Sequence, residues 1–208
     1  MSRSPIDAPF GAVIFLTAPP PRAPLDRAAV GHLDAEPMEI DGLGDAGTAI
    51  AALQPVTILA SDLRRDAAVA SRLGDATRAP VAFDRRLRER SFGVWEGRTW
   101  TDLVVNEPAA VAFLEHFDTD APPGGESTTA VAERAGAPIR ELLMKKHRQT
   151  IAVVAAPTVV RAVLADALGL PHGATARWRL DPLSTTGLRF EGRFATLAWV
   201  NRFGTTLF

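Results

Sequence analysis

A short irregular segment, residues 85–97, contains the side chains best suited to chemistry, and we call it the acid loop. Its charged and aromatic residues follow neither helical nor strand spacing, and its two glycines suit an ordered loop. Binding and catalytic residues often lie on ordered loops carried by a rigid scaffold. Glu89 is the candidate acid. Four arginines lie near it in sequence, so a solvated cluster of ion pairs is the alternative interpretation.

A second candidate site follows the apolar stretch at residues 56–60. Ser61 and Asp62 are suitable N-cap residues for the next helix, which puts Arg64 and Arg65 in its first turns. In open α/β sheets, ligands bind where a strand ends and a helix begins, and the helix dipole and arginine both attract an anion there. The alternative is that both arginines are surface charges paired with neighbours. That alternative suits Arg64 better than Arg65.

Other kinds of site find little support. Residues 42–47 match the dinucleotide-binding pattern G-x-G-x-x-G, and Asp62 lies at about the distance of a ribose-binding acid. That pattern needs a buried strand directly before it, whereas residues 32–41 are mostly polar, so we expect no nucleotide site there. The chain has no cysteine, no histidine or carboxylate cluster with metal-ligand spacing, no G-x-S-x-G turn and no P-loop. We therefore expect no metal and no cofactor.

The elements that would position these residues alternate between strand and helix. Short apolar runs predict strands at residues 12–16, 56–60, 81–83, 150–155, 183–190 and 193–200. Helical patterns fall at residues 42–53, 63–73, 100–106, 108–116, 127–146 and 157–168. This alternation predicts a three-layer α/β/α sandwich with a mixed, mostly parallel sheet of about six strands. We expect one domain over residues 1–208, with residues 1–11 as a flexible tail.

Composition limits the class of partner. The net charge is −1, which gives no electrostatic footprint for DNA or RNA. No apolar run approaches the ~18 residues of a membrane span, and the N-terminus lacks the pattern of a secretory signal. We therefore expect a cytoplasmic protein without nucleic-acid or membrane partners, and its ligand to be small and anionic or phosphorylated. A homo-oligomer is compatible with the sequence.

Three motifs together resemble the histidine phosphatase superfamily, also called the phosphoglycerate mutase-like family. Residues 61–65 look like its helix-opening motif, the acid loop looks like its acid-bearing loop, and residues 122–127 look like its Pro-Gly-Gly-Glu-Ser turn. In order and spacing the resemblance covers about residue 12 to the C-terminus. It implies the three-layer fold predicted above. It also implies a ligand-binding role for Arg65 and Ser61 and an acid role for Glu89.

The family's two active-site histidines have no counterpart in this alignment. The family motif Leu-Val-Arg-His-Gly-Glu-Thr aligns with residues 15–21, which puts Thr17 at the arginine position, as a further ligand-binding candidate, and Ala18 at the nucleophilic histidine. The second histidine position falls on Ala156. An alanine methyl cannot accept a phosphoryl group, so the covalent step would be lost. None of the four histidines is an obvious substitute: His32, His116, His147 and His172.

These observations lead to one main functional hypothesis and two alternatives. The main hypothesis is a catalytically inactive homologue, a pseudo-phosphatase that binds a ligand or partner or acts as a scaffold. The first alternative is a phosphomonoester hydrolase or other hydrolase with altered chemistry, in which Glu89 is the acid or base and Arg65 holds an anionic group. The second is a structural subunit of a homo-oligomer.

Overall fold

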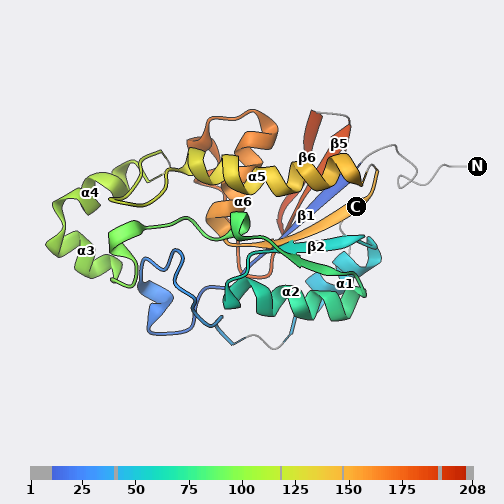
Figure 1. Cartoon of the computed structure of the whole chain (residues 1–208), viewed down its shortest axis with the longest axis horizontal. Coiled ribbons are helices and arrows are strands. Elements are labelled where there is room, and N and C mark those ends of the chain that lie inside the picture. Colours follow the sequence, from blue (N-terminus) through green and yellow to red (C-terminus); the bar gives the residue numbers. More distant parts are fainter. Residues whose placement is uncertain (1–10, 40–41, 118, 147, 192–193, 205–208) are drawn as a thin grey trace, which may run out of the picture.

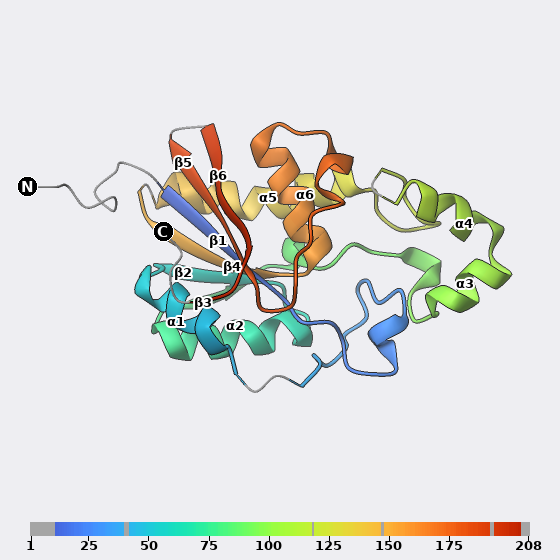
Figure 2. The ribbon, with the colours of Figure 1, turned by 180° about the vertical axis from the view of Figure 1, so that it is seen from behind.

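The computed structural model describes residues 11–39, 42–117, 119–146, 148–191 and 194–204. Within these residues one sheet has the strand order β3-β2-β4-β1-β5-β6. Strands β1, β2, β3 and β4 run parallel to one another, while β5 is antiparallel to both of its neighbours. The bounds of the strands are β1 Gly11–Thr17, β2 Thr57–Ala60, β3 Val81–Phe83, β4 Thr150–Ala155, β5 Thr185–Glu191 and β6 Phe194–Arg202. Figure 2 shows β5 and β6 beside β1.

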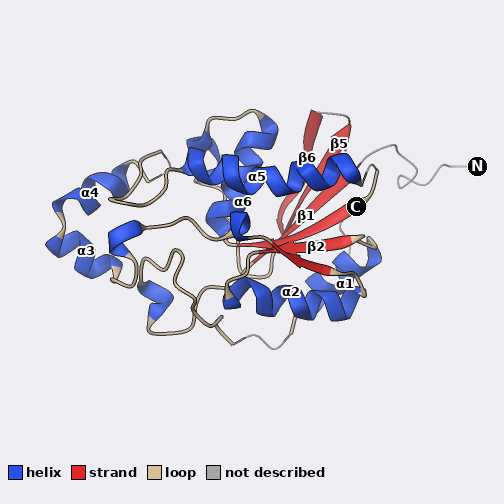
Figure 3. Ribbon diagram, viewed as in Figure 1, coloured by secondary structure: helices blue, strands red, loops and turns tan. Residues whose placement is uncertain are grey.

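Helices cover both faces of the sheet, which confirms the predicted three-layer sandwich (Figures 1 and 3). The helices α1 and α2 pack on one face, around a cluster that includes Ile14 and Leu16 of β1. On the other face α5 and α6 pack around Val13 and Phe15. Because successive side chains of a strand point to opposite faces, the apolar run of β1 supplies both clusters. The bounds of the helices are α1 Gly44–Ala52, α2 Arg64–Thr77, α3 Trp100–Asn106, α4 Pro108–Glu115, α5 Thr128–Lys145 and α6 Pro157–Leu168.

The chain between β1 and α1 is an ordered loop that packs against the rest of the molecule. Its backbone closes on itself, since the amide of Arg22 donates to Glu36 O at 2.8 Å and the amide of Met38 donates to Pro20 O at 2.8 Å. It also packs against the acid loop, where the Gly97 amide donates to the carbonyl of the buried Ala29 at 2.9 Å. Sequence reasoning missed this contact because it depends on where two distant loops meet.

Several predicted boundaries differ from those of the structure; α2, for example, ends at Thr77 and not at residue 73. Gly11, assigned to a flexible tail, is the first residue of β1, and residues 1–10 lie outside the described part of the chain. The helix α5 continues through Pro138. No helix among the described residues is both long and apolar enough to cross a membrane.

Candidate functional site

The parallel strands end together at one edge of the sheet, and the candidate residues gather there. In the pairing of β1 with β4, Thr17 lies opposite Ala155. The amide of Ala18 then donates to the carbonyl of Ala155 at 2.8 Å. Ala18 and Ala156 therefore lie at neighbouring strand ends, as the sequence predicted, and both are buried. The carboxyl end of β2, which leads into Ser61, lies on the other side of β4.

The two neighbouring arginines of α2 have opposite surroundings. Arg64 is exposed and binds the carboxylates of Asp34 and Glu36 at 3.0 and 2.6 Å, so it is the paired surface charge that the sequence suggested. Arg65 is only 4% exposed. Its Nε and Nη2 atoms are buried, and neither has a hydrogen-bond partner among the described residues. Leaving buried donors unpaired is unfavourable, so these two atoms are well suited to bind an anion.

Ser61 does not cap α2, contrary to the prediction. The N-cap position is Leu63, and the Ser61 hydroxyl accepts from the Leu63 amide at 3.3 Å. The same hydroxyl donates to Oδ2 of Asp66 at 2.6 Å. Asp62 is not a cap either, because its carboxylate binds Arg88 at 2.6 Å.

Asp66 is the site residue that sequence reasoning missed. It is completely buried, and its Oδ1 lies 3.6 Å from Nε of Arg65. Burial raises its pKa to about 6; Arg65 and the hydrogen bond from Ser61 oppose this rise, and the negative charge of Glu89 adds to it. The one available signal was helical geometry. Asp66 follows Arg64 by two residues, so the two side chains lie on nearly opposite sides of the helix, and an exposed Arg64 puts Asp66 on the buried side.

Thr17 is buried at the end of β1, where its hydroxyl lies 3.3 Å from the hydroxyl of Ser184. Its amide donates to the Ser184 carbonyl at 3.0 Å, and its own carbonyl accepts from Leu183 at 2.9 Å. The turn before β5 therefore holds Thr17 in place. The ligand-binding role of Thr17 stays a prediction, and its hydroxyl faces a protein partner in this structure.

Glu89 is half-buried in the acid loop, and its Oε1 accepts from the amide of Arg90 at 2.7 Å. Because its charge acts on Asp66, Glu89 belongs to the same electrostatic neighbourhood as Arg65. The arginines around Glu89 serve the scaffold: Arg86 binds Asp84 and Glu141, and Arg88 binds Asp62. The candidate acid therefore lies beside two arginines that are already paired with other carboxylates.

Arg134 of α5 binds the backbone of the acid loop. Its guanidinium donates to the carbonyls of Arg86, Arg88 and Glu89 at 2.8, 2.8 and 2.9 Å. It also binds both carboxylate oxygens of Glu126 at 2.6 Å. Planar guanidinium groups suit such multiple contacts. Arg134 thus fixes the backbone beside the candidate acid.

None of the contacts described above involves a described histidine or the dinucleotide pattern. His147 lies outside the described residues, and His32 Nε2 lies 3.8 Å from Glu126 Oε2. Gly44 already begins α1, and no strand directly precedes it within the described residues. In the described part of the chain, no three His, Asp or Glu side chains come together as metal ligands would.

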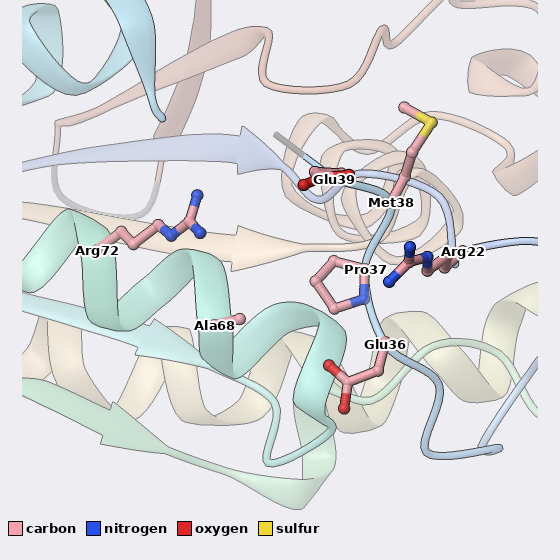
Figure 4. Close-up of a pocket in the computed structure, with 7 residues that line it drawn as sticks. All are labelled: Arg22, Glu36, Pro37, Met38, Glu39, Ala68 and Arg72. Carbon is pink, nitrogen blue, oxygen red and sulfur yellow. The ribbon is translucent and has the colours of Figure 1, made fainter. Parts of the chain in front are cut away.

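A separate hollow of about 260 Å³ lies on the outer side of α2 (Figure 4). Arg22 and Met38 line it from the loop after β1, and Ala68 and Arg72 line it from α2. The residues lining it do not include Arg65 or Glu89. The candidate site at the sheet edge is therefore distinct from this hollow.

Comparison with known proteins agrees with this geometry. The model of the histidine phosphatase superfamily (branch 1) matches residues 27–202. The glucosyl-3-phosphoglycerate phosphatase of Mycolicibacterium vanbaalenii is 35% identical over 133 residues, which cover 61% of this chain and 59% of that enzyme, less than two thirds of its length. The adenosylcobalamin/alpha-ribazole phosphatase of Escherichia coli is 27% identical over 184 residues, which cover 86% of this chain and 90% of that enzyme.

Solved structures extend the likeness over nearly the whole fold. A mycobacterial glucosyl-3-phosphoglycerate phosphatase in complex with VO3 superposes with a TM-score of 0.80 at 28% identity, covering 91% of this chain and 98% of that one. These relatives are named as phosphatases. The prediction of a catalytically inactive homologue is therefore wrong, and the alternative prediction of a hydrolase with altered chemistry is the better supported.

Proposed function

The chain belongs to the histidine phosphatase superfamily, and on that premise we propose that it is a phosphomonoester hydrolase with altered chemistry. Arg65 supports this proposal most directly, because its buried Nε and Nη2 have no partner among the described residues. A phosphoryl oxygen is the kind of acceptor that would satisfy them. We assign the enzyme to the cytoplasm and its ligand to small phosphorylated molecules.

We further propose that this is a divergent member in which Ala18 and Ala156 occupy the two histidine positions. Their place at neighbouring strand ends beside Ser61 supports the assignment. Without a nucleophilic ring nitrogen, the attacking group is water. The water oxygen bonds to phosphorus as the ester oxygen leaves, the water loses a proton to the site, and the leaving oxygen gains one. Glu89 is the donor of the proton that the leaving oxygen gains.

The first test measures hydrolysis of p-nitrophenyl phosphate and of a panel of sugar phosphates, including glucosyl-3-phosphoglycerate. Arg65→Met should lower kcat/KM about 10²- to 10³-fold, because it removes the cation that stabilises the transferring group. Arg64→Met is the matched control, since it removes the same charge one residue away from an exposed ion pair. The proposal fails if the wild-type protein hydrolyses none of these esters, or if both variants behave alike.

A second variant tests the acid. Glu89→Gln should slow alkyl phosphates more than p-nitrophenyl phosphate, because nitrophenolate leaves without help from a proton donor. An equal loss on both substrates would assign Glu89 to another role.

A further inference from the structure

Asp66 has one carboxylate oxygen in a short hydrogen bond and one in a long ion pair with Arg65. Its Oδ2 accepts from the Ser61 hydroxyl at 2.6 Å, whereas its buried Oδ1 has no hydrogen-bond partner among the described residues. The side chain is fully buried. A buried carboxylate oxygen without a donor is unfavourable, so a donor such as water is expected there when the site is occupied.

Oδ1 of Asp66 lies beside the donors of Arg65. Oδ1 and Nε of Arg65 form an ion pair at 3.6 Å, which is too long for a hydrogen bond, and Nη2 of Arg65 has no hydrogen-bond partner among the described residues either. A phosphoryl oxygen is an acceptor for the Arg65 donors, and a water molecule is a donor for Oδ1. Because the donors and the acceptor lie side by side, an ester held by Arg65 and a water held by Asp66 would be neighbours, as direct hydrolysis needs.

We propose that Asp66 is the general base, whose Oδ1 takes a proton from the water that attacks phosphorus while Arg65 holds the phosphoryl group. This inference rests on the proposed phosphatase function. As the O–P bond to water forms, the ester O–P bond breaks and the water proton moves to Oδ1. Glu89 in its acid form gives a proton to the leaving oxygen. The two carboxyl groups exchange states once per turnover, and solvent resets them.

The proton affinity of Asp66 suits this role. Burial raises its pKa to about 6, and among the charged groups that face it Arg65 lowers the pKa and Glu89 raises it. A general base works best when its pKa lies near the operating pH, because it is then both ionised and basic.

The decisive variant is Asp66→Asn, assayed with p-nitrophenyl phosphate across pH. We expect kcat to fall about 10²- to 10⁴-fold, the usual contribution of a general base, and the acidic limb of the profile to disappear. Orthophosphate should bind as tightly as in the wild type or more tightly, because a negative charge beside Arg65 is removed. Asp75→Asn is the matched control, since Asp75 is exposed on the same helix.

A second variant keeps the test valid if Asp66→Asn folds poorly. Ser61→Ala removes a hydrogen bond that lowers the pKa of Asp66, so the acidic limb should move to higher pH. The substrate titrates identically with every variant, so the shift reports the enzyme. An active Asp66→Asn that keeps its acidic limb, or a Ser61→Ala profile that does not move, overturns the role of Asp66 alone. Absence of wild-type hydrolysis overturns the phosphatase function as well.

Discussion

At the scale of single residues, the buried charge of Asp66 should lower stability in a pH-dependent way. Its pKa is raised from 3.8 to about 6 on folding, so between these values the folded protein holds a proton that the unfolded chain lacks. Stability therefore falls as pH rises through this window, by up to roughly 3 kcal/mol above pH 6. We expect Asp66→Asn to raise the Tm clearly at pH 8 and much less at pH 4.

Thermal unfolding of wild type, Asp66→Asn and Asp75→Asn at both pH values checks this prediction. The exposed Asp75 should show no pH-dependent gain when its charge is removed. A gain for Asp66→Asn of the same size at pH 4 and pH 8 would contradict the prediction, because it would show that the charge is not the cause.

The sequence identified some of the residues at the start of α2 and missed others. It distinguished Arg64 from Arg65 correctly, because the side chains of adjacent helical residues point about 100° apart and can have different surroundings. It missed Asp66, since a carboxylate is expected on the surface and sequence alone gives no measure of burial. The sequence predicted that Ser61 caps the helix, whereas its hydroxyl donates to Asp66. This hydrogen bond depends on the burial of Asp66, which the sequence did not show.

At the scale of elements, the acid loop should depend on Arg134 for its shape. This side chain binds three loop carbonyls and the Glu126 carboxylate from within α5. Arg134→Met removes all of these hydrogen bonds in a partly buried position, and among the described residues only Glu126 of these acceptors keeps a second donor, the amide of Ser91 at 2.9 Å. We expect a loss of about 2–4 kcal/mol in the free energy of unfolding, measured by urea denaturation, together with reduced activity.

Arg140→Met is the control for Arg134, because Arg140 lies on the same helix in an exposed ion pair with Asp166. Such surface pairs contribute about 0–1 kcal/mol. Similar losses for the two variants would show that α5 is sensitive to any lost arginine and that the acid loop has no special dependence on Arg134.

The elements themselves were largely predictable, since strong local signals fix them. Buried runs of β-branched residues identified β1 and β4, and prolines at the first helical turn identified the starts of α4 and α6. The loop between β1 and α1 was not predictable, because its backbone hydrogen bonds to itself and to the acid loop join residues far apart in sequence. No local pattern encodes such pairings.

At the scale of the whole molecule, α3 and α4 form a small unit with its own aromatic core. Figure 1 shows both helices beyond the sheet, on the side away from the N-terminus. Phe113 of α4 contacts the rings of Phe92, Trp95 and Trp100, and the Arg90 guanidinium lies 5.0 Å from its centroid. Phe113→Ala should cost about 3–5 kcal/mol locally.

We expect hydrogen exchange in this variant to accelerate in α3, α4 and the acid loop, while β1 and β4 stay protected, because the sheet core is a separate cluster. Val105→Ala is the control, since Val105 is 74% exposed on α3. Uniform acceleration across the sheet strands would show that the unit and the sheet unfold together.

The last prediction concerns the reaction that the whole sheet edge permits. The sheet order brings the ends of β1 and β4 together, beside Ala18 and Ala156. In the assignment proposed above, these alanines stand where covalent catalysis would need a ring nitrogen. Direct attack by water displaces the ester oxygen in one step and inverts the configuration at phosphorus, whereas a phosphoenzyme route displaces twice and retains it. We expect inversion with an isotopically chiral phosphomonoester, and no acid-labile phosphoryl label on any histidine peptide after quenching. Retention together with such a label would show that a histidine elsewhere in the chain reaches this edge, and would replace the direct mechanism with a covalent one.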